Sequence, residues 1–239
     1  MSLKNIVAKF LQTIKNYFKT IFHFRSTYIL LFISLMAVFM SLIRVLITRQ
    51  PFYLFMNTNL FLAFIPWFFA SFVYANRIEN KIILCVTIFF WLLFFPNAPY
   101  MLTDLIHLRV PQFRNAPLWY DLIMLLTFGF AGLYYGFISL QMIEEKISTV
   151  FNCRFSKWIS IGFIYISCFG IYLGRFLRFN SWDLFGNFSG LMKSILCRVV
   201  MPVDYWRTWG FTILAGTLLN VVYVMMKGDE TKIEKNKEK

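Results

Sequence analysis

Six long apolar stretches dominate this 239-residue chain and constrain its fold more than any other feature. A helix needs about 20 apolar residues to cross the hydrocarbon layer of a membrane. The stretches cover residues 28–47, 54–75, 81–97, 118–142, 157–177 and 206–226. With 59% hydrophobic and 15% charged residues, the composition also lies outside the range of ordinary soluble domains. The sequence therefore predicts an all-α membrane protein in which about six transmembrane helices form a single domain over residues 28–226.

Two further segments are apolar on one face only. In residues 1–27, apolar side chains recur at three- and four-residue spacing and the lysines lie mainly opposite, which is typical of a helix in the headgroup layer. Residues 183–200 carry a similar stripe and predict a second amphipathic helix, either interfacial or re-entrant, between the fifth and sixth spans. Residues 227–239 form a charged tail. The first apolar run lacks a small-residue cleavage site, so we expect a retained anchor rather than a signal peptide.

Small residues recur at two places inside the apolar stretches. Gly132 and Gly136 are four residues apart, and so are Gly170 and Gly174. Such spacing lets two membrane helices approach closely.

The basic residues are distributed unequally between the two sides of the membrane. Of the 24 Lys and Arg residues, 15 fall on the side of the termini and nine on the opposite side. This imbalance predicts cytoplasmic termini, and it suits anionic lipid headgroups rather than nucleic acid, for which the chain has no motif. The outer cations are eight Arg and one Lys, and the outer acids are all Asp. Because Arg binds carboxylate and phosphate through a planar fork, we expect any chemistry on the outer side.

The first outer motif is FPNAPYMLTDLIHL, residues 95–108. Pro96 and Pro99 bracket Asn97 and predict a non-helical corner, where the Asn97 amide either satisfies backbone groups or binds a ligand. If the following stretch is helical, Asp104 and His107 share a face. There the carboxylate would orient the imidazole, or both would bind a divalent metal ion. In the alternative interpretation, Asp104 caps a short helix and His107 lies at the interface.

The second outer motif is GIYLGRFLRFNSWD, residues 170–183. Arg175 and Arg178 are three residues apart at the outer end of the fifth span, against the charge bias that orients the chain. This position predicts specific partners: Asp104, Asp121 or Asp183 in a structural lock, or an anionic ligand such as a lipid phosphate. Asn180 is expected in the turn that precedes the amphipathic helix.

These motifs, together with WYD at residues 119–121, resemble a bacterial membrane family known as domain of unknown function 1361. The resemblance covers about residues 30–225. It implies a multi-pass protein of the bacterial inner, or cytoplasmic, membrane, and it implies no activity.

Three classes of function are compatible with this pattern. In an enzyme, Asp104, His107, Asp121 and Asp183 would supply acid, base or metal ligands, while Asn97, Arg175, Arg178 and Asn180 would bind an outer-leaflet lipid or a lipid-linked envelope precursor. In a non-catalytic component, the same network would bind a partner or a lipid headgroup. A coupled transporter usually carries ionisable groups near the membrane midplane, where the predicted spans have only Asn and Thr.

Overall fold

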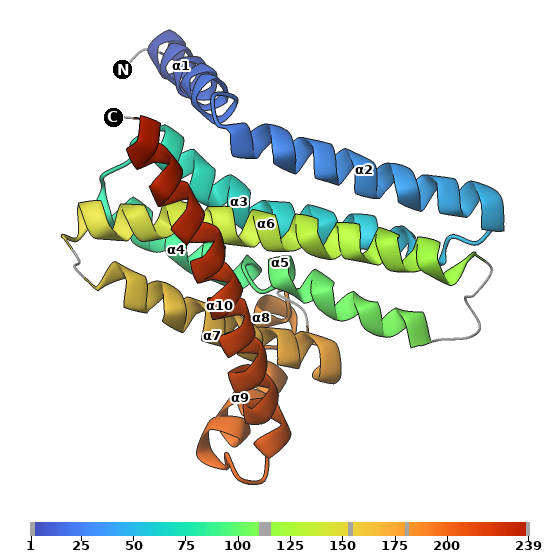
Figure 1. Cartoon of the computed structure of the whole chain (residues 1–239). Helices are drawn as coiled ribbons and strands as arrows, with labels where there is room; N and C mark the ends of the chain where they lie inside the picture. The colour runs from blue at the N-terminus through green and yellow to red at the C-terminus, as the bar shows by residue number, and fades with distance from the viewer. Residues whose placement is uncertain (1–2, 110–115, 153–154, 180–181, 238–239) are drawn as a thin grey trace. The chain divides into compact units, whose positions relative to one another are not determined.

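The computed structural model describes residues 3–109, 116–152, 155–179 and 182–237 (Figure 1). The chain forms two compact units, Met1–Ser156 and Lys157–Lys239, which we describe separately. Every regular element in the described ranges is helical, as predicted. The single domain predicted over residues 28–226 stays a prediction.

Among the described residues, six helical segments are long and apolar enough to cross a membrane. They comprise Arg25–Thr48, Phe52–Ala75, Lys81–Leu108, Leu118–Val150, Ser156–Leu177 and Trp206–Lys227. Each contains most of one predicted span, so the prediction of an all-α, multi-pass membrane protein is confirmed. The third segment extends well beyond its predicted end at residue 97 and includes Asp104.

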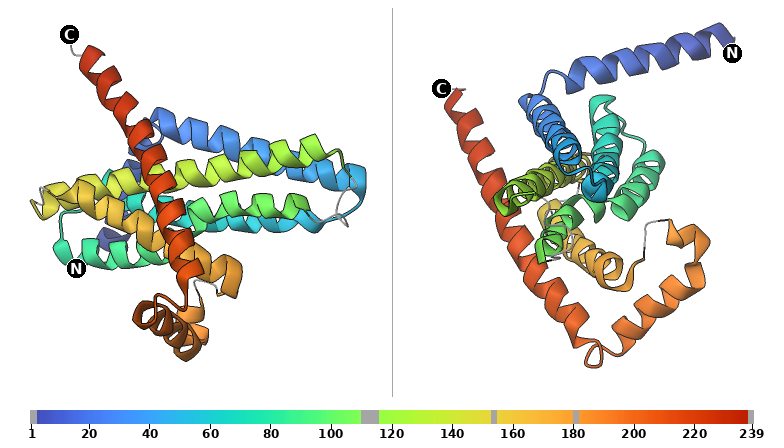
Figure 2. Two further views of the ribbon diagram at one scale, coloured as in Figure 1. Left: turned by 60° about the horizontal axis from the view of Figure 1, so that its bottom comes forward. Right: turned by 90° about the vertical axis from the view of Figure 1, so that its right-hand side faces the viewer.

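The first unit contains four of these segments. In chain order its elements are α1 Leu3–Ile21, α2 Arg25–Thr48, the 3₁₀ turn η1 Phe52–Leu54, α3 Phe55–Ala75, α4 Lys81–Phe94, α5 Asn97–Tyr100, the 3₁₀ helix η2 Met101–Arg109 and α6 Leu118–Val150. Figures 1 and 2 show α2, α3 and α6 running alongside one another, with α6 also packed against α5 and η2. The most buried of the candidate spans is α6, which forms the centre of this unit.

The predicted amphipathic helix at the N-terminus is α1, which ends at Ile21. A short turn separates it from α2, where the Thr27 hydroxyl donates to the Ile21 carbonyl over 2.6 Å. A hydrogen bond of 3.1 Å between the hydroxyls of Tyr17 and Ser71 ties α1 to the last turns of α3. The helix is therefore held against the membrane-spanning part of the unit.

Glycines on α6 determine how closely the α5–η2 segment approaches. A Cβ atom at Gly132 would overlap the backbone carbonyl oxygen of Ala98, and one at Gly136 would lie 3.1 Å from the Cβ of Ala98. A Cβ at Gly129 would lie 2.9 Å from a side-chain carbon of Leu102. The Gly132–Gly136 spacing thus permits the close contact that the sequence predicts, and it brings η2 onto α6.

The third span breaks between α4 and α5 because of its two prolines. The backbone turns at Phe95 and Pro96, and the helical path then resumes, so the predicted non-helical corner is only a short interruption. The N–H of Ala98 bonds to the Phe95 carbonyl instead of the Phe94 carbonyl. The Asn97 side chain donates to Phe94 O over 3.0 Å. Asn97 therefore satisfies a backbone group at the break, one of its two predicted roles.

The second unit comprises α7 Ser156–Leu177, α8 Asp183–Gly186, α9 Phe188–Val200 and α10 Trp206–Lys237. The helix predicted over residues 183–200 is interrupted at Asn187, whose backbone is non-helical. Trp209 donates its indole N–H to the Arg198 carbonyl over 2.9 Å and so links α10 to α9. Aromatic contacts between Tyr172 and Phe211 join α7 to α10.

Candidate functional site

Polar side chains from four segments gather at one end of the first unit. The end of α2 supplies Arg44, the start of α3 supplies Asn59, η2 supplies Asp104 and His107, and the start of α6 supplies Asp121. In Figure 1 this is the end where the α2–η1 connection lies. These residues form two separate arrangements, which differ in their exposure.

The first arrangement is a buried ion pair between Arg44 and Asp121. The Nε of Arg44 lies 2.6 Å from one carboxylate oxygen of Asp121, and Nη2 lies 3.1 Å from the other. Both side chains are almost wholly buried, at 0% and 5% exposure. Two parallel N–H donors on one carboxylate make a strong and geometrically specific contact. The pair joins α2 to α6 across 77 residues of sequence.

Neighbouring groups reinforce this ion pair. The aromatic ring of Tyr53 lies under the guanidinium group, with 4.3 Å between Cζ of Arg44 and the ring centroid. The hydroxyl of Tyr120 donates to the Met40 carbonyl over 2.8 Å, one turn before Arg44 on α2. The carboxylate and the ring face offset part of the cost of burying the Arg44 cation. We interpret this arrangement as a structural lock between α2, η1 and α6.

The second arrangement is the pair Asp104 and His107 on η2. Three-residue spacing places side chains directly above one another in a 3₁₀ helix. Nδ1 of His107 lies 2.9 Å from the backbone oxygen of Asp104 and 3.6 Å from its carboxylate oxygen Oδ1. The predicted shared face of these two residues is therefore confirmed.

Burial distinguishes the two members of this pair. Asp104 is fully buried, and its other carboxylate oxygen accepts a hydrogen bond of 3.1 Å from the amide of Asn59. The side chain of His107 keeps 24% of its surface exposed. Its ring packs at 5.2 Å from the Phe55 ring and 6.1 Å from the Phe52 ring. The imidazole is thus hydrogen-bonded on one edge, packed against two aromatic rings and exposed over about a quarter of its side chain.

The tautomer of the His107 ring follows from this contact. A carbonyl oxygen only accepts, so the nitrogen beside it, Nδ1, carries the hydrogen. In the neutral ring the lone pair is then at Nε2. This is the arrangement of a base whose orientation is fixed by a neighbouring acceptor.

Two aromatic residues connect the arrangements. Phe52 contacts both His107 and the adjacent Tyr53, whose ring centroid lies 4.9 Å away. Tyr53 in turn lies against Arg44. The lock and His107 therefore contact the same group of aromatic side chains, which comes from η1 and the first turn of α3.

Four further predicted site residues follow later in the chain, after residue 170. Arg175 is in the last turn of α7, Arg178 follows that helix with a left-handed backbone (φ 63°), and Asp183 begins α8. All three belong to the second unit, and Asn180 falls outside the described residues. Their predicted meeting with Asp104 and Asp121 stays a prediction.

The sequence interpretation missed Arg44 and Asn59. It proposed Arg175 or Arg178 as the partner of Asp121, whereas the structure pairs Asp121 with Arg44. Arg44 lies inside the predicted first span, and an arginine inside an apolar span is costly unless it is paired. That position was the available signal for a buried partner.

The divalent-metal interpretation of Asp104 and His107 also stays a prediction. Nδ1, the nitrogen nearest the Asp104 carboxylate, carries a hydrogen, so a metal ion would have to bind at Nε2. Within the part of the chain that the structure describes, no third His, Cys, Asp or Glu joins this pair in a metal-binding group.

Comparison with known proteins gives one match. The family model described as "Protein of unknown function (DUF1361)" matches residues 58–222, most of the chain. Neither the curated proteins nor the solved structures contain a match. The matched region includes η2 and α6 but not Arg44.

Proposed function

Because this chain belongs to the DUF1361 family and is a multi-pass membrane protein, we propose that it is an enzyme acting on a lipid or a lipid-linked envelope precursor. The reaction takes place at the outer boundary between membrane and water. His107 is the acid–base group, and Asp104 is the residue that positions it.

One observation carries this proposal: Nδ1 of His107 is hydrogen-bonded to the Asp104 carbonyl while about a quarter of the side chain stays exposed. General acid–base catalysis requires a group whose orientation is held and whose reacting atom can reach the substrate. In this proposal Nε2 is the atom that reacts with the substrate, because Nδ1 is hydrogen-bonded. The buried Asp104 carboxylate, 3.6 Å from Nδ1, stabilises the imidazolium that forms when Nε2 takes up a proton.

The lock has a different role in this proposal. Arg44 and Asp121 satisfy each other, so Asp121, predicted as catalytic, is assigned to holding the site together. Arg175 and Arg178 remain the candidates to bind the anionic part of the substrate, because a guanidinium fork suits phosphate. Asn97, Asn180 and Asp183 are retained as further candidates for substrate contacts.

The orientation is part of the proposal. The excess of Lys and Arg on the side of the termini supports cytoplasmic termini. His107, at the other end of the third candidate span, then faces the outer boundary. A lipid or lipid-linked substrate reaches this position within the membrane plane.

The test uses cells of the source organism from which the gene has been deleted. Their lipids are compared with those of the same cells carrying a plasmid-borne wild-type or variant copy. We expect lipid mass spectrometry to find a lipid or lipid-linked species that accumulates without the gene and disappears with the wild-type copy. His107→Gln should leave it accumulated, and Asp104→Asn should do the same because the carboxylate charge is lost. The matched control is His23→Gln, since His23 is the other histidine of the chain and lies exposed outside the site.

The outcome is interpreted only with variants that accumulate in the membrane to the wild-type level. Full lipid turnover by His107→Gln at that level would contradict the catalytic role.

A specific observation favours a second candidate, a non-catalytic component that binds a partner or a lipid headgroup. The Asp104 carboxylate is fully buried and already accepts a hydrogen bond from Asn59, as in a structural network. In that case no lipid species would depend on His107. In cells that carry the Asp121→Asn variant, function would instead decline in proportion to the loss of folded protein.

A further inference from the structure

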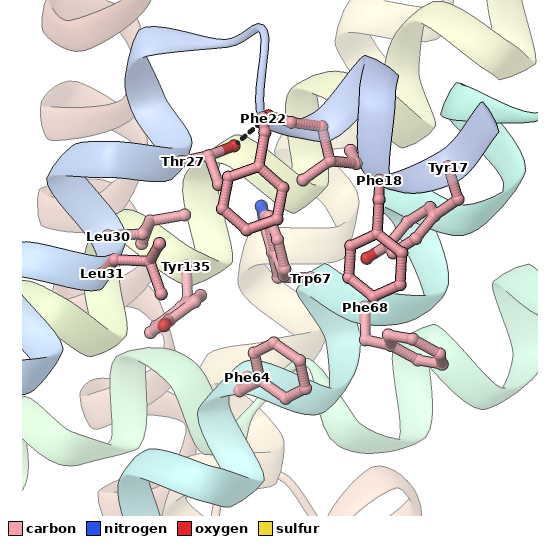
Figure 3. A pocket seen from close by; sticks show the side chains of 11 residues that line it. Tyr17, Phe18, Phe22, Thr27, Leu30, Leu31, Phe64, Trp67, Phe68 and Tyr135 are labelled. Carbon is pink, nitrogen blue, oxygen red and sulfur yellow. Dashed lines mark hydrogen bonds between the residues drawn. The ribbon is translucent and has the colours of Figure 1, made fainter. Parts of the chain in front are cut away.

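An apolar pocket lies beneath α1, at the opposite end of the first unit from His107. It has a volume of about 210 Å³ and is open on one side. Figure 3 shows its wall, with Phe18 and Phe22 from the α1 region, Leu31 from α2, Phe64 and Trp67 from α3, and Tyr135 from α6. Almost all of the lining surface is apolar. Four segments distant in sequence thus combine to form a single hydrocarbon-lined space.

Most polar groups in the wall are already paired. The Tyr17 hydroxyl bonds to Ser71, and the Tyr135 hydroxyl bonds to Ser34 over 2.9 Å. Burial raises the pKa of Tyr17, so its hydroxyl stays neutral in this pocket.

Trp67 is different. Its side chain is 94% buried, since the residue keeps 6% of its surface, and its indole nitrogen finds no hydrogen-bond partner among the described residues. Figure 3 shows the Trp67 ring among the lining side chains, with the nitrogen drawn on the side of Phe22 and Thr27. A buried N–H without an acceptor is costly, and an acceptor supplied by a ligand removes that cost.

The α1 region beside the pocket is basic. Lys15, Lys19 and Arg25 are exposed there. The chain has no acidic residue before Glu79, and the carboxylate of Glu145 on α6 accepts a hydrogen bond from Tyr74, whose ring contacts Phe24. Basic side chains on an amphipathic helix attract anionic headgroups at the membrane surface.

We propose that this pocket binds one acyl chain of an anionic phospholipid from the leaflet nearest α1. The chain fills the aromatic-lined space, the Trp67 N–H donates to an ester carbonyl, and the headgroup lies on Lys15, Lys19 and Arg25. The apolar wall, the unpartnered indole and the basic helix each match one part of such a molecule. This inference does not depend on the proposed activity of His107.

The test uses the full chain in phosphatidylcholine vesicles that contain phosphatidylglycerol with a photoreactive acyl chain. After illumination, mass spectrometry should locate the label on peptides that contain Phe22, Leu31 or Trp67. Unlabelled phosphatidylglycerol should compete. A label spread evenly over the lipid-exposed surface would overturn the proposal.

A pocket-filling substitution tests the acyl chain. Leu31→Trp should lower labelling about tenfold, the effect of excluding about two methylene groups. Leu35→Trp is the matched control, because Leu35 lies one turn further on α2, is exposed and does not line the pocket. Leu31 is itself 42% exposed, so a larger side chain there leaves the helix core intact. Equal labelling of both variants would overturn the pocket assignment.

Two further variants test the polar contacts. Trp67→Phe keeps an aromatic ring and should lower labelling about threefold through the lost hydrogen bond. Lys15→Gln and Lys19→Gln should each lower it about fivefold, whereas Lys81→Gln, at an exposed position of the first unit that does not line the pocket, should not. A photoreactive phosphatidylcholine that labels as strongly as phosphatidylglycerol would overturn the assignment of the headgroup.

Discussion

The two polar arrangements of the first unit use similar residues for different purposes. Arg44 and Asp121 are both buried, and each satisfies the other through two hydrogen bonds. Asp104 is equally buried, but its neighbour His107 keeps a quarter of its side chain exposed. A charge enclosed on every side holds helices together, whereas a ring held on one edge has an atom left for chemistry. Exposure separates the lock from the candidate reactive group, and so does residue type, because a guanidinium stays protonated in proteins and does not act as a base.

The largest expected effect comes from breaking the lock. Asp121→Asn leaves the Arg44 cation buried without a counter-charge, which should lower the free energy of unfolding by about 3–5 kcal/mol. Thermal unfolding of the purified protein in detergent measures this loss.

The double variant Arg44→Met with Asp121→Leu should recover most of the lost stability, because no buried charge remains. If Asp121→Asn loses less than about 1 kcal/mol, the pair is no structural lock and the comparison fails.

A smaller effect should follow from moving η2 without touching the lock. Gly132→Ala places a methyl group against the Ala98 carbonyl, so α5 and η2 must shift, at a cost of about 1–3 kcal/mol. Gly162→Ala is the matched control, since a Cβ there meets nothing within 4 Å. The Gly132 variant should impair the proposed reaction more than its stability loss explains, because η2 carries His107. Full activity of a Gly132→Ala protein would contradict this positioning.

The smallest effect on stability is expected at His107. His107→Gln removes a part-exposed ring that makes one backbone hydrogen bond. The free energy of unfolding should therefore change by less than about 1 kcal/mol. The Asp121→Asn variant should therefore lose stability, whereas the His107→Gln variant should lose function with little change in stability. A loss of several kcal/mol in His107→Gln would assign the ring to the structure.

Local patterns in the sequence predicted the parts of this fold that depend on spacing. The six apolar stretches became six candidate spans, and the three- and four-residue repeat near the N-terminus became α1. The i,i+3 spacing of Asp104 and His107 predicted a shared face, since that relation needs only a local helix. The spacing of Gly132 and Gly136 predicted a close helix contact but not its partner, which the structure identifies as α5 and η2.

Such local patterns did not predict which residues of distant segments pair with one another. Arg44 and Asp121 are 77 residues apart, and the sequence contains four other aspartates and ten other arginines that could serve as partners. The Asn59 contact with Asp104 likewise depends on how α3 packs beside η2. The third candidate span continues past residue 97, and the Asn97 side chain donates to the Phe94 carbonyl at the break between α4 and α5.

The most direct test of the central claim is the tautomer of His107 in the folded protein. The chain has two histidines, so a sample labelled with ¹⁵N-histidine gives two ring signals, and His23→Gln assigns them. In a bilayer sample with the ring neutral, we predict that His107 carries its hydrogen on Nδ1 and has its lone pair on Nε2. A signal from the Nε2–H tautomer, or a motional average of both tautomers, would contradict the account.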